Sequence, residues 1–296
     1  MKLGPLSGYD APVTFLAVAG LVVGASNPTY LAFINELKTM RIRANFIAFK
    51  TILIKEMLRF LRIWIQTILP AAITMSLYFI IFGKLIGSQI GSIHGVSYMQ
   101  YIVPGLIMMA VITNSYANVV ASFYSSKFQR HIEEMLVSPL PNYLILLGFV
   151  AGGAARGLIV GAMVTVVSLF FNHLHIYSLA IMLVVTVLTA VLFSLGGFVN
   201  GIFANSFDDT AIVPTFVLTP LTYLGGVFYS IEMLPEFWRR LSQFNPILYI
   251  VNAFRYGILG IADIDIRLAF AIILLFIAGL FSFSLWLLAR GVGIRQ

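Results

Sequence analysis

The stretch GGVFYSIEMLPEFWRRLSQFNPILY, residues 225–249, interrupts a strongly apolar sequence with two prolines and four charged side chains. The charges are Glu232, Glu236, Arg239 and Arg240. After Pro246 the sequence is apolar again, but only as far as Gly260. A helix needs about 20 apolar residues to cross a bilayer, so this second stretch is too short. We therefore expect a helical hairpin that dips into the membrane and returns, which is tolerated where protein buries the turn. A loop lying on the membrane surface is the alternative.

The composition places the whole chain in a membrane. Of its 296 residues 60% are hydrophobic and only 10% are charged, with a mean hydropathy of +0.99. Soluble domains are about 45–50% apolar and about 25% charged. Long apolar runs without strict alternation favour helices over a β-barrel. The chain has no cysteine, which excludes disulfides, thiol catalysis and cysteine-ligated metals. The expected fold is an all-α integral membrane protein.

Six apolar runs are long enough to span a bilayer. We place them at Trp64–Ile86, Tyr101–Phe123, Tyr143–Phe171, Ser178–Phe203, Ala211–Tyr229 and Arg267–Ala289. With these spans, twelve Lys and Arg residues fall on the side of the two termini and five on the other side. The positive-inside rule then puts both termini in the cytoplasm. Because the basic excess sets topology, we expect no nucleic-acid partner.

The chain before the first span divides into two parts. Residues 1–44 are an uncertain extension, whose apolar run Ala11–Ala25 is short for a span. A misassigned start, a cleaved segment and an extra partial membrane segment all remain open. Residues 45–63 read as an amphipathic helix on the cytoplasmic surface, with Lys55, Arg59 and Arg62 on one face. Residues 64–296 then form the transmembrane domain.

The loop SSKFQRHIEEMLVSPLPNY, residues 125–143, predicts a short helix between spans two and three. Ser126 and Gln129 have the spacing of a capping box, and Pro139 and Pro141 would end the helix. Apolar residues at helical spacing give it one buried face, so it could transmit a push from a cytoplasmic partner to both spans. An ordinary solvated loop helix is the alternative.

Several of these stretches resemble, in order, the ABC-2 family of transport permeases and, within it, inner-membrane permeases of Gram-negative bacteria. EEMLVSPLP at Glu133–Pro141 is similar to the loop after the second span in that family. FNPILYIVNAFRYGILG at Phe244–Gly260 is similar to its signature before the last span. The resemblance covers residues 46–296 and leaves residues 1–44 without a counterpart.

The resemblance implies the membrane subunit of an ABC exporter in the bacterial inner membrane, multi-pass and most simply a homodimer among membrane lipids. A coupling helix would dock on a separate cytoplasmic ATPase, which would hold ATP and Mg, so this chain would be no enzyme and would bind no cofactor itself. The coupling positions are Phe128, Arg130, Glu133, Glu134, Ser138 and Pro139. Two short re-entrant helices would cap the path on the periplasmic side. The corresponding gate positions are Gly225, Gly226, Pro235, Trp238, Asn245, Pro246 and Arg255.

The energy source has one alternative. The sequence has no G-x-x-x-x-G-K-[ST] phosphate loop, so the chain cannot cradle ATP by that motif. An ion-coupled secondary carrier would need titratable groups inside the membrane, whereas every acidic residue reads as lying in a loop or surface segment. Arg156 is the one charge deep within a span, and it either lines the path or else snorkels to the cytoplasmic surface or binds helix carbonyls. His173 and His175 have no third ligand nearby, so no metal site is expected. The substrate cannot be identified from the sequence.

Overall fold

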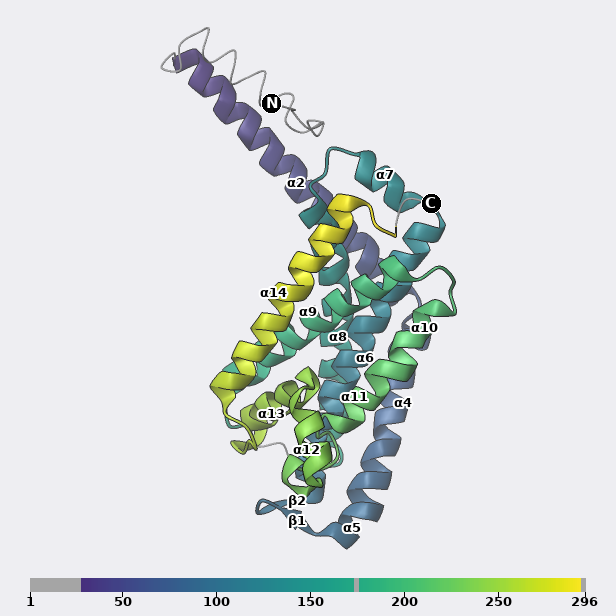
Figure 1. Ribbon diagram of the computed structural model, residues 1–296, viewed down its shortest axis with the longest axis vertical. Helices are drawn as coiled ribbons and strands as arrows, with labels where there is room; N and C mark the ends of the chain where they lie inside the picture. The colour runs from purple at the N-terminus through teal and green to yellow at the C-terminus, as the bar shows by residue number, and fades with distance from the viewer. Residues whose placement is uncertain (1–27, 173–175, 294–296) are drawn as a thin grey trace.

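The computed structural model describes residues 28–172 and 176–293 and is almost entirely helical (Figure 1). The apolar run Ala11–Ala25 and the two histidines at 173 and 175 lie outside these residues. Within the described residues, five helical stretches are long and apolar enough to cross a membrane. They are Trp64–Ile90, α6 (Tyr98–Phe128), α8 (Asn142–Leu169), α9 (Leu179–Phe203) and α14 (Ile266–Arg290). The integral membrane fold is therefore confirmed, and five of the six expected spans have the required length.

The first span is a series of short helices. It consists of α3 (Trp64–Thr67), α4 (Leu69–Tyr78), a π-helical stretch η1 (Phe79–Ile86) and α5 (Gly87–Ile90). Pro70 lies at the start of α4 and has no N–H to continue the ladder, which explains the break after α3. A two-stranded antiparallel hairpin, β1 (Ser92–Ile93) and β2 (Val96–Ser97), leads into α6.

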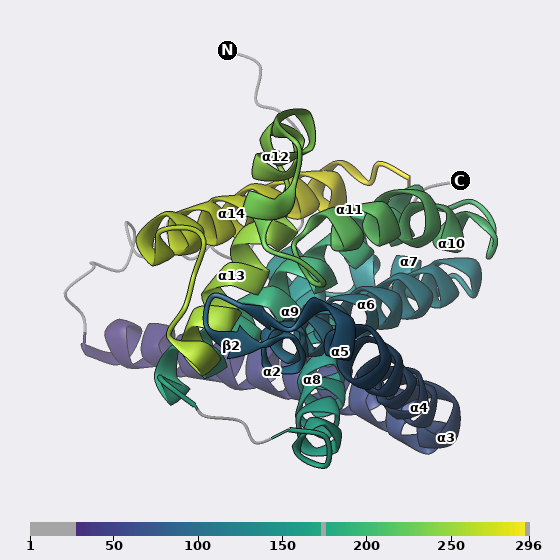
Figure 2. The same cartoon turned by 90° about the horizontal axis from the view of Figure 1, so that it is seen from below.

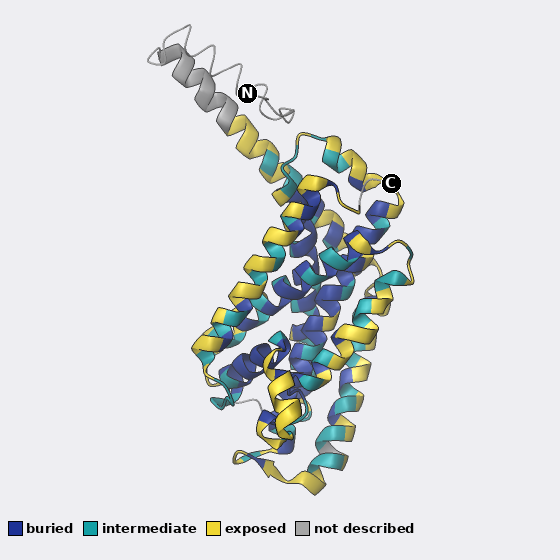
Figure 3. Cartoon of the chain, in the orientation of Figure 1, coloured by how far each residue is buried: buried dark blue, intermediate teal, exposed yellow. Residues whose placement is uncertain are grey.

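Helices α6, α8 and α9 form the core of the bundle, shown in dark blue in Figure 3. Apolar burial gives little driving force between helices in lipid, so close fit of small residues matters more. Gly153 and Gly157 of α8 lie directly against Ser115 of α6, and Gly197 of α9 lies against the Tyr116 carbonyl. A side chain at any of these positions would separate the helices. The glycine pattern thus serves packing within this chain.

Helix α2 (Pro28–Arg62) is longer than the expected surface helix at residues 45–63, and its first half projects beyond the bundle (Figure 1). Its second half packs on α8, where Ile52 and Glu56 lie against Gly148 and Gly152. Glu56 is only 1% exposed, so the expectation that every acidic residue lies on the surface is wrong. The cause is the two glycines, which let α2 approach too closely for Glu56 to reach solvent.

The capping box predicted from Ser126 and Gln129 does not form. Helix α6 continues through Ser126 to Phe128 and has Gln129 as its C-terminal cap, and Ser126 is buried. The next helix, α7 (His131–Val137), begins after Arg130, whose φ of 61° turns the chain sharply. A true capping box occurs at the other end of α6, between Ser97 and Gln100. The same pattern therefore caps a helix only where the preceding chain is not already helical.

The fifth predicted span, Ala211–Tyr229, is a broken helix. It comprises α10 (Asp209–Val213), a π-helical stretch η2 (Pro214–Leu218) and α11 (Thr219–Leu224). These 16 residues reach about 24 Å at 1.5 Å per residue, short of the roughly 30 Å hydrocarbon core. Pro214 and Pro220 interrupt the ladder of hydrogen bonds. The six-span count therefore stays a prediction.

The segment quoted at the outset forms η3 (Ile231–Met233), α12 (Glu236–Gln243) and α13 (Pro246–Leu259). The two longer helices differ in their surroundings: α13 is buried in the bundle, while α12 is exposed along most of its length and projects from it (Figures 2 and 3). Helix α7 and the α9–α10 turn lie at one end of the molecule, and α12 and the β-hairpin lie at the opposite end (Figure 1).

Candidate functional site

Helix α7 is held firmly between the ends of α6 and α8. Its Ile132 is fully buried in an apolar cluster with Phe123 of α6 and with Ile145 and Phe149 of α8. Helix α7 ends at Val137, and α8 begins directly after Pro141, as the two prolines predict. A force on this short helix would therefore act on both long helices.

The outer face of the same loop carries the predicted coupling residues. Phe128, Arg130, Glu133, Glu134 and Pro139 are exposed, while Ser138 is half-buried and donates to the Met135 carbonyl at 2.6 Å. Phe128 belongs to the last turn of α6 and not to α7. It is 66% exposed. These residues thus lie in the connection from α6 through α7 to α8, at one end of the bundle (Figure 1).

At the opposite end, Arg255 fixes the turn that we call the gate segment, residues 225–230. Arg255 is fully buried in α13. Its Nη2 donates to the Gly226 carbonyl at 2.6 Å, and its Nε donates to the Tyr101 carbonyl at 3.3 Å. Its guanidinium also lies 3.9 Å from the centre of the Tyr101 ring. One side chain therefore ties α13, α6 and the gate segment together.

Three further predicted gate residues hold the gate segment against α13. Asn245 caps α13 by accepting from the Ile247 N–H at 3.0 Å, and its amide donates to the Leu221 carbonyl. Gly226 has a φ of +70°, a conformation that strongly favours glycine. Gly225 lies against Ile247 with no room for a side chain. These residues join α11 to α13.

Pro235 and Trp238 lie outside this network. Pro235 precedes α12, and Trp238 is 45% exposed beside Phe237. Pro246 is the first residue of α13 and is half-buried. The structure therefore groups Gly225, Gly226, Asn245, Pro246 and Arg255, and leaves Pro235 and Trp238 on the protruding α12.

The sequence did not single out Asp263, which completes the network. Its carboxylate is 2% exposed and accepts from the Ser230 hydroxyl at 2.9 Å and from the Tyr101 hydroxyl at 3.3 Å. His94 of the β-hairpin lies 3.6 Å away, and the Asp263 N–H donates to Asn252. In the sequence Asp263 looks like an ordinary loop residue. The residues that contact it come from four separate segments of the chain, which only the fold brings together.

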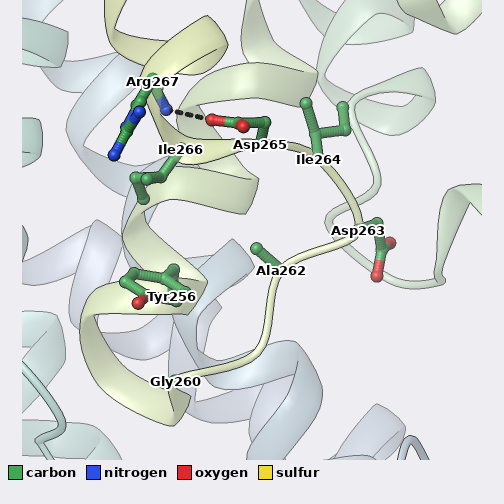
Figure 4. A pocket seen from close by; sticks show the side chains of 8 residues that line it. All are labelled: Tyr256, Gly260, Ala262, Asp263, Ile264, Asp265, Ile266 and Arg267. Carbon is green, nitrogen blue, oxygen red and sulfur yellow. Dashed lines mark hydrogen bonds between the residues drawn. The ribbon is translucent and has the colours of Figure 1, made fainter.

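A hollow of about 510 Å³ lies beside Asp263, between the end of α13 and the start of α14 (Figure 4). Tyr256, Asp265 and Arg267 contribute to its lining, and the Asp265 carboxylate accepts from the Arg267 N–H at 2.7 Å. That bond caps α14, so Asp265 has a structural role. None of the predicted gate residues lines this hollow.

Arg156 lies deep in α8 and uses helix groups as partners. It donates to the Thr67 carbonyl at 3.3 Å and to the Asn114 side chain at 3.1 Å. The Thr67 carbonyl is available because the break before α4 diverts the Ala71 N–H to Ile68. A second polar junction lies nearby, where Arg59 donates to Asn118 at 2.8 Å and lies 3.5 Å from Glu56. The contact with Thr67 is of the kind expected if Arg156 binds helix carbonyls. That Arg156 lines a transport path stays a prediction.

The chain is similar to known proteins over most of its length. Residues 47–259 match a family model described as ABC-2 type transporter. Over 250 residues the chain is 57% identical to "Inner membrane transport permease YadH" of Escherichia coli strain K12, covering 84% of this chain and 98% of that protein. It is 26% identical over 209 residues to "Nodulation protein J" of Rhizobium leguminosarum bv. viciae, covering 70% of this chain and 81% of that protein. The match to the family model begins within α2 and ends with α13.

Proposed function

This chain belongs to the ABC-2 type transporter family, and we propose that it is the membrane subunit of an exporter powered by a separate cytoplasmic ATPase. Members of this family normally pair with such an ATPase. By analogy with the permease of E. coli, its place is the bacterial inner membrane, with both termini in the cytoplasm.

The position of α7 supports this proposal most directly. Its exposed face carries Glu133 and Glu134, while its buried face carries Ile132 between α6 and α8. A partner that binds the exposed face would move the two core helices together. The sequence has no phosphate-loop motif, so the proposal assigns nucleotide binding to that partner.

The burial of Glu56 bears on the alternative of an ion-coupled carrier, because such a carrier would need a titratable group inside the membrane. Glu56 lies on α2, outside the five long spans, and its neighbour Arg59 is 3.5 Å away. The two residues are one turn apart on α2, and Arg59 also donates to the Asn118 side chain of α6 at 2.8 Å, so the pair belongs to the packing of α2 against α6. Coupling to ATP therefore remains the better account of the energy source.

The transport path would lie at the interface of two copies of this chain. The first span and the α10–α11 segment present exposed apolar side chains such as Ile73, Leu77 and Phe216, which a second copy or lipid would cover. The gate segment and α13 would close the periplasmic side. Because such a path is lined by apolar and aromatic groups, we infer an amphipathic substrate of the drug or glycolipid type.

The proposal is tested by reconstitution. The chain is purified from its own bacterium, and a co-purifying ATPase is identified by its phosphate-loop sequence. Both proteins are placed in liposomes, and movement of a fluorescent phospholipid analogue and of lipophilic dyes is followed after adding Mg-ATP. We expect ATP-dependent movement that survives a protonophore. ATP hydrolysis by the purified chain alone, or loss of transport when the proton gradient is dissipated, would refute the proposal.

A further inference from the structure

Two cytoplasmic loops meet in an exposed aromatic cluster that the sequence did not predict. Phe207, in the turn between α9 and α10, packs against Phe128 with ring centres 5.4 Å apart. Tyr124 of α6 lies beneath both rings, 4.8 Å from Phe207 and 6.3 Å from Phe128. Tyr124 is only 4% exposed, whereas Phe207 is 55% exposed and Phe128 is 66% exposed. Two large rings are therefore presented outward on a fixed base.

The turn that carries Phe207 is held by polar contacts on both sides. The Lys127 ammonium donates to the Ile202 and Ala204 carbonyls, both at 2.8 Å, and the Tyr124 hydroxyl donates to the Asn205 carbonyl at 3.0 Å. These bonds fasten the turn to the end of α6. Because the turn is already ordered, presenting Phe207 to a partner would cost little conformational entropy.

Asp209 completes this arrangement. Its carboxylate accepts from the Asn205 N–H at 2.9 Å and from the Ser206 N–H at 3.1 Å. Asp208 precedes α10 but makes no side-chain capping bond, and the Asp209 carboxylate turns back to the preceding loop. The backbone N–H donors of Asn205 and then the Ser206 hydroxyl keep the pKa of Asp209 below its usual range.

The neighbours of Phe207 argue against burial in lipid. Asp208 and Asp209 follow it directly, and Asn205 and Ser206 precede it. The cytoplasmic leaflet of a membrane has a negative surface potential, so two carboxylates beside the ring are repelled by lipid headgroups. Exposed aromatic rings with a polar rim are typical of the centre of protein–protein interfaces.

We propose that Phe207 and Phe128 together form a second docking point for the ATPase, next to α7. This inference rests on the proposed function, because Phe128 lies on the same surface as Glu133 and Glu134 of α7. It extends the coupling surface from the loop between α6 and α8 to the turn between α9 and α10. The ATPase would then act directly on α10–α11, which leads to the gate segment held by Arg255.

Site-specific photo-crosslinking in intact cells tests the inference. The photoreactive residue p-benzoylphenylalanine replaces Phe207, Phe128 or, as a control, Phe170, which is 84% exposed at the end of α8 away from α7. Adducts are identified by mass spectrometry. We expect a phosphate-loop ATPase bound at positions 207 and 128, and none at position 170.

The outcomes separate this inference from the proposed function. If position 128 captures the ATPase while position 207 gives only lipid adducts or none, the docking point at Phe207 is refuted and the exporter subunit stands. If neither position captures an ATPase, and positions 133 and 134 also fail, the proposed function fails as well.

A binding measurement gives a second test with the captured ATPase. The chain in lipid nanodiscs carries Phe207→Ser or the control Phe203→Ser, since Phe203 is 51% exposed on α9 and lies outside the aromatic cluster. We expect the dissociation constant to rise at least about tenfold for Phe207→Ser, which is about 1.4 kcal/mol, and to stay unchanged for Phe203→Ser. Equal affinities of the Phe207→Ser chain and the unmodified chain would overturn the proposal.

Discussion

Replacing Arg255 by methionine should loosen the periplasmic side of the protein. Methionine keeps much of the volume and removes every polar contact. The change leaves two carbonyl oxygens, those of Gly226 and Tyr101, without the donors that now lie 2.6 and 3.3 Å away. It also removes the cation–π contact with the Tyr101 ring at 3.9 Å.

The magnitude follows from these three contacts. Side-chain hydrogen bonds in membrane proteins contribute about 0.6 kcal/mol on average and at most about 1.7 kcal/mol. A desolvated cation–π contact contributes about 1–2 kcal/mol. The buried cation itself carries a desolvation penalty, which methionine relieves in part. We therefore expect Arg255→Met to lower the free energy of unfolding by about 2–3 kcal/mol.

Steric trapping in bicelles measures that free energy directly. Arg267→Met is the matched control, because Arg267 is exposed and should change stability by less than about 0.5 kcal/mol. Arg255→Lys keeps the charge but cannot reach both carbonyls with a planar fork, so it should fall between the two. If Arg255→Met matches the unmodified protein, or if Arg255→Lys restores full stability, the reasoning that one guanidinium joins α13, α6 and the gate segment is refuted.

Three further predictions concern packing and charge. Gly105→Ala should destabilise the protein by about 1–3 kcal/mol, because the new methyl carbon would lie 2.6 Å from the Val227 carbonyl oxygen in the gate segment. Gly279→Ala is the control: its methyl carbon meets nothing within 4 Å, so it should leave stability unchanged in the same assay. A double-mutant cycle between Glu56 and Arg59 should give a coupling energy of about 0.5–2 kcal/mol, and zero coupling would exclude the buried ion pair. Because Asp209 has a pKa below its usual range in the folded state, its contribution to stability is present above the unfolded value of about 3.9 and is lost only as pH falls through the lower folded value. The rate of maleimide labelling of a cysteine at the α9–α10 turn, divided by the rate for free cysteine at the same pH to remove the thiolate dependence, should therefore not vary between pH 5 and pH 8.

Length and hydropathy were sufficient to find the long spans. Helices α6, α8, α9 and α14 each lie within a few residues of the stretches expected from the apolar runs. The same reasoning could not resolve residues 211–229, because hydropathy cannot show that Pro214 and Pro220 divide the run into three pieces. The contrast between charged α12 and apolar α13 is visible in the sequence, but only packing shows that α13 is buried in the bundle while α12 projects from it.

The polar network was harder to predict than the helices. Arg255 and Gly226 were singled out by resemblance, but nothing in the sequence joins them to Tyr101, Ser230 and Asp263. These residues meet only because the gate segment folds back on α6. Glu56 was misjudged for a related reason, since its burial depends on glycines in α8 almost a hundred residues later.

The distribution of burial indicates which helices of the bundle are rigid and which segments can deform. In α6 and α8, 78% and 67% of the residues in the most apolar window are buried, against 11% in the first span. The first span and the α10–α11 segment are also the two that contain π-helical turns, at Phe79–Ile86 and Pro214–Leu218. Such turns weaken the regular hydrogen-bond ladder and often occur at functional positions. Helix α6 joins Phe128 at one end to Tyr101 near the other as one continuous helix, so it is suited to move as a rigid unit. Motion imposed at the cytoplasmic surface is then most easily taken up by the two irregular segments, and one of these leads directly to the gate segment.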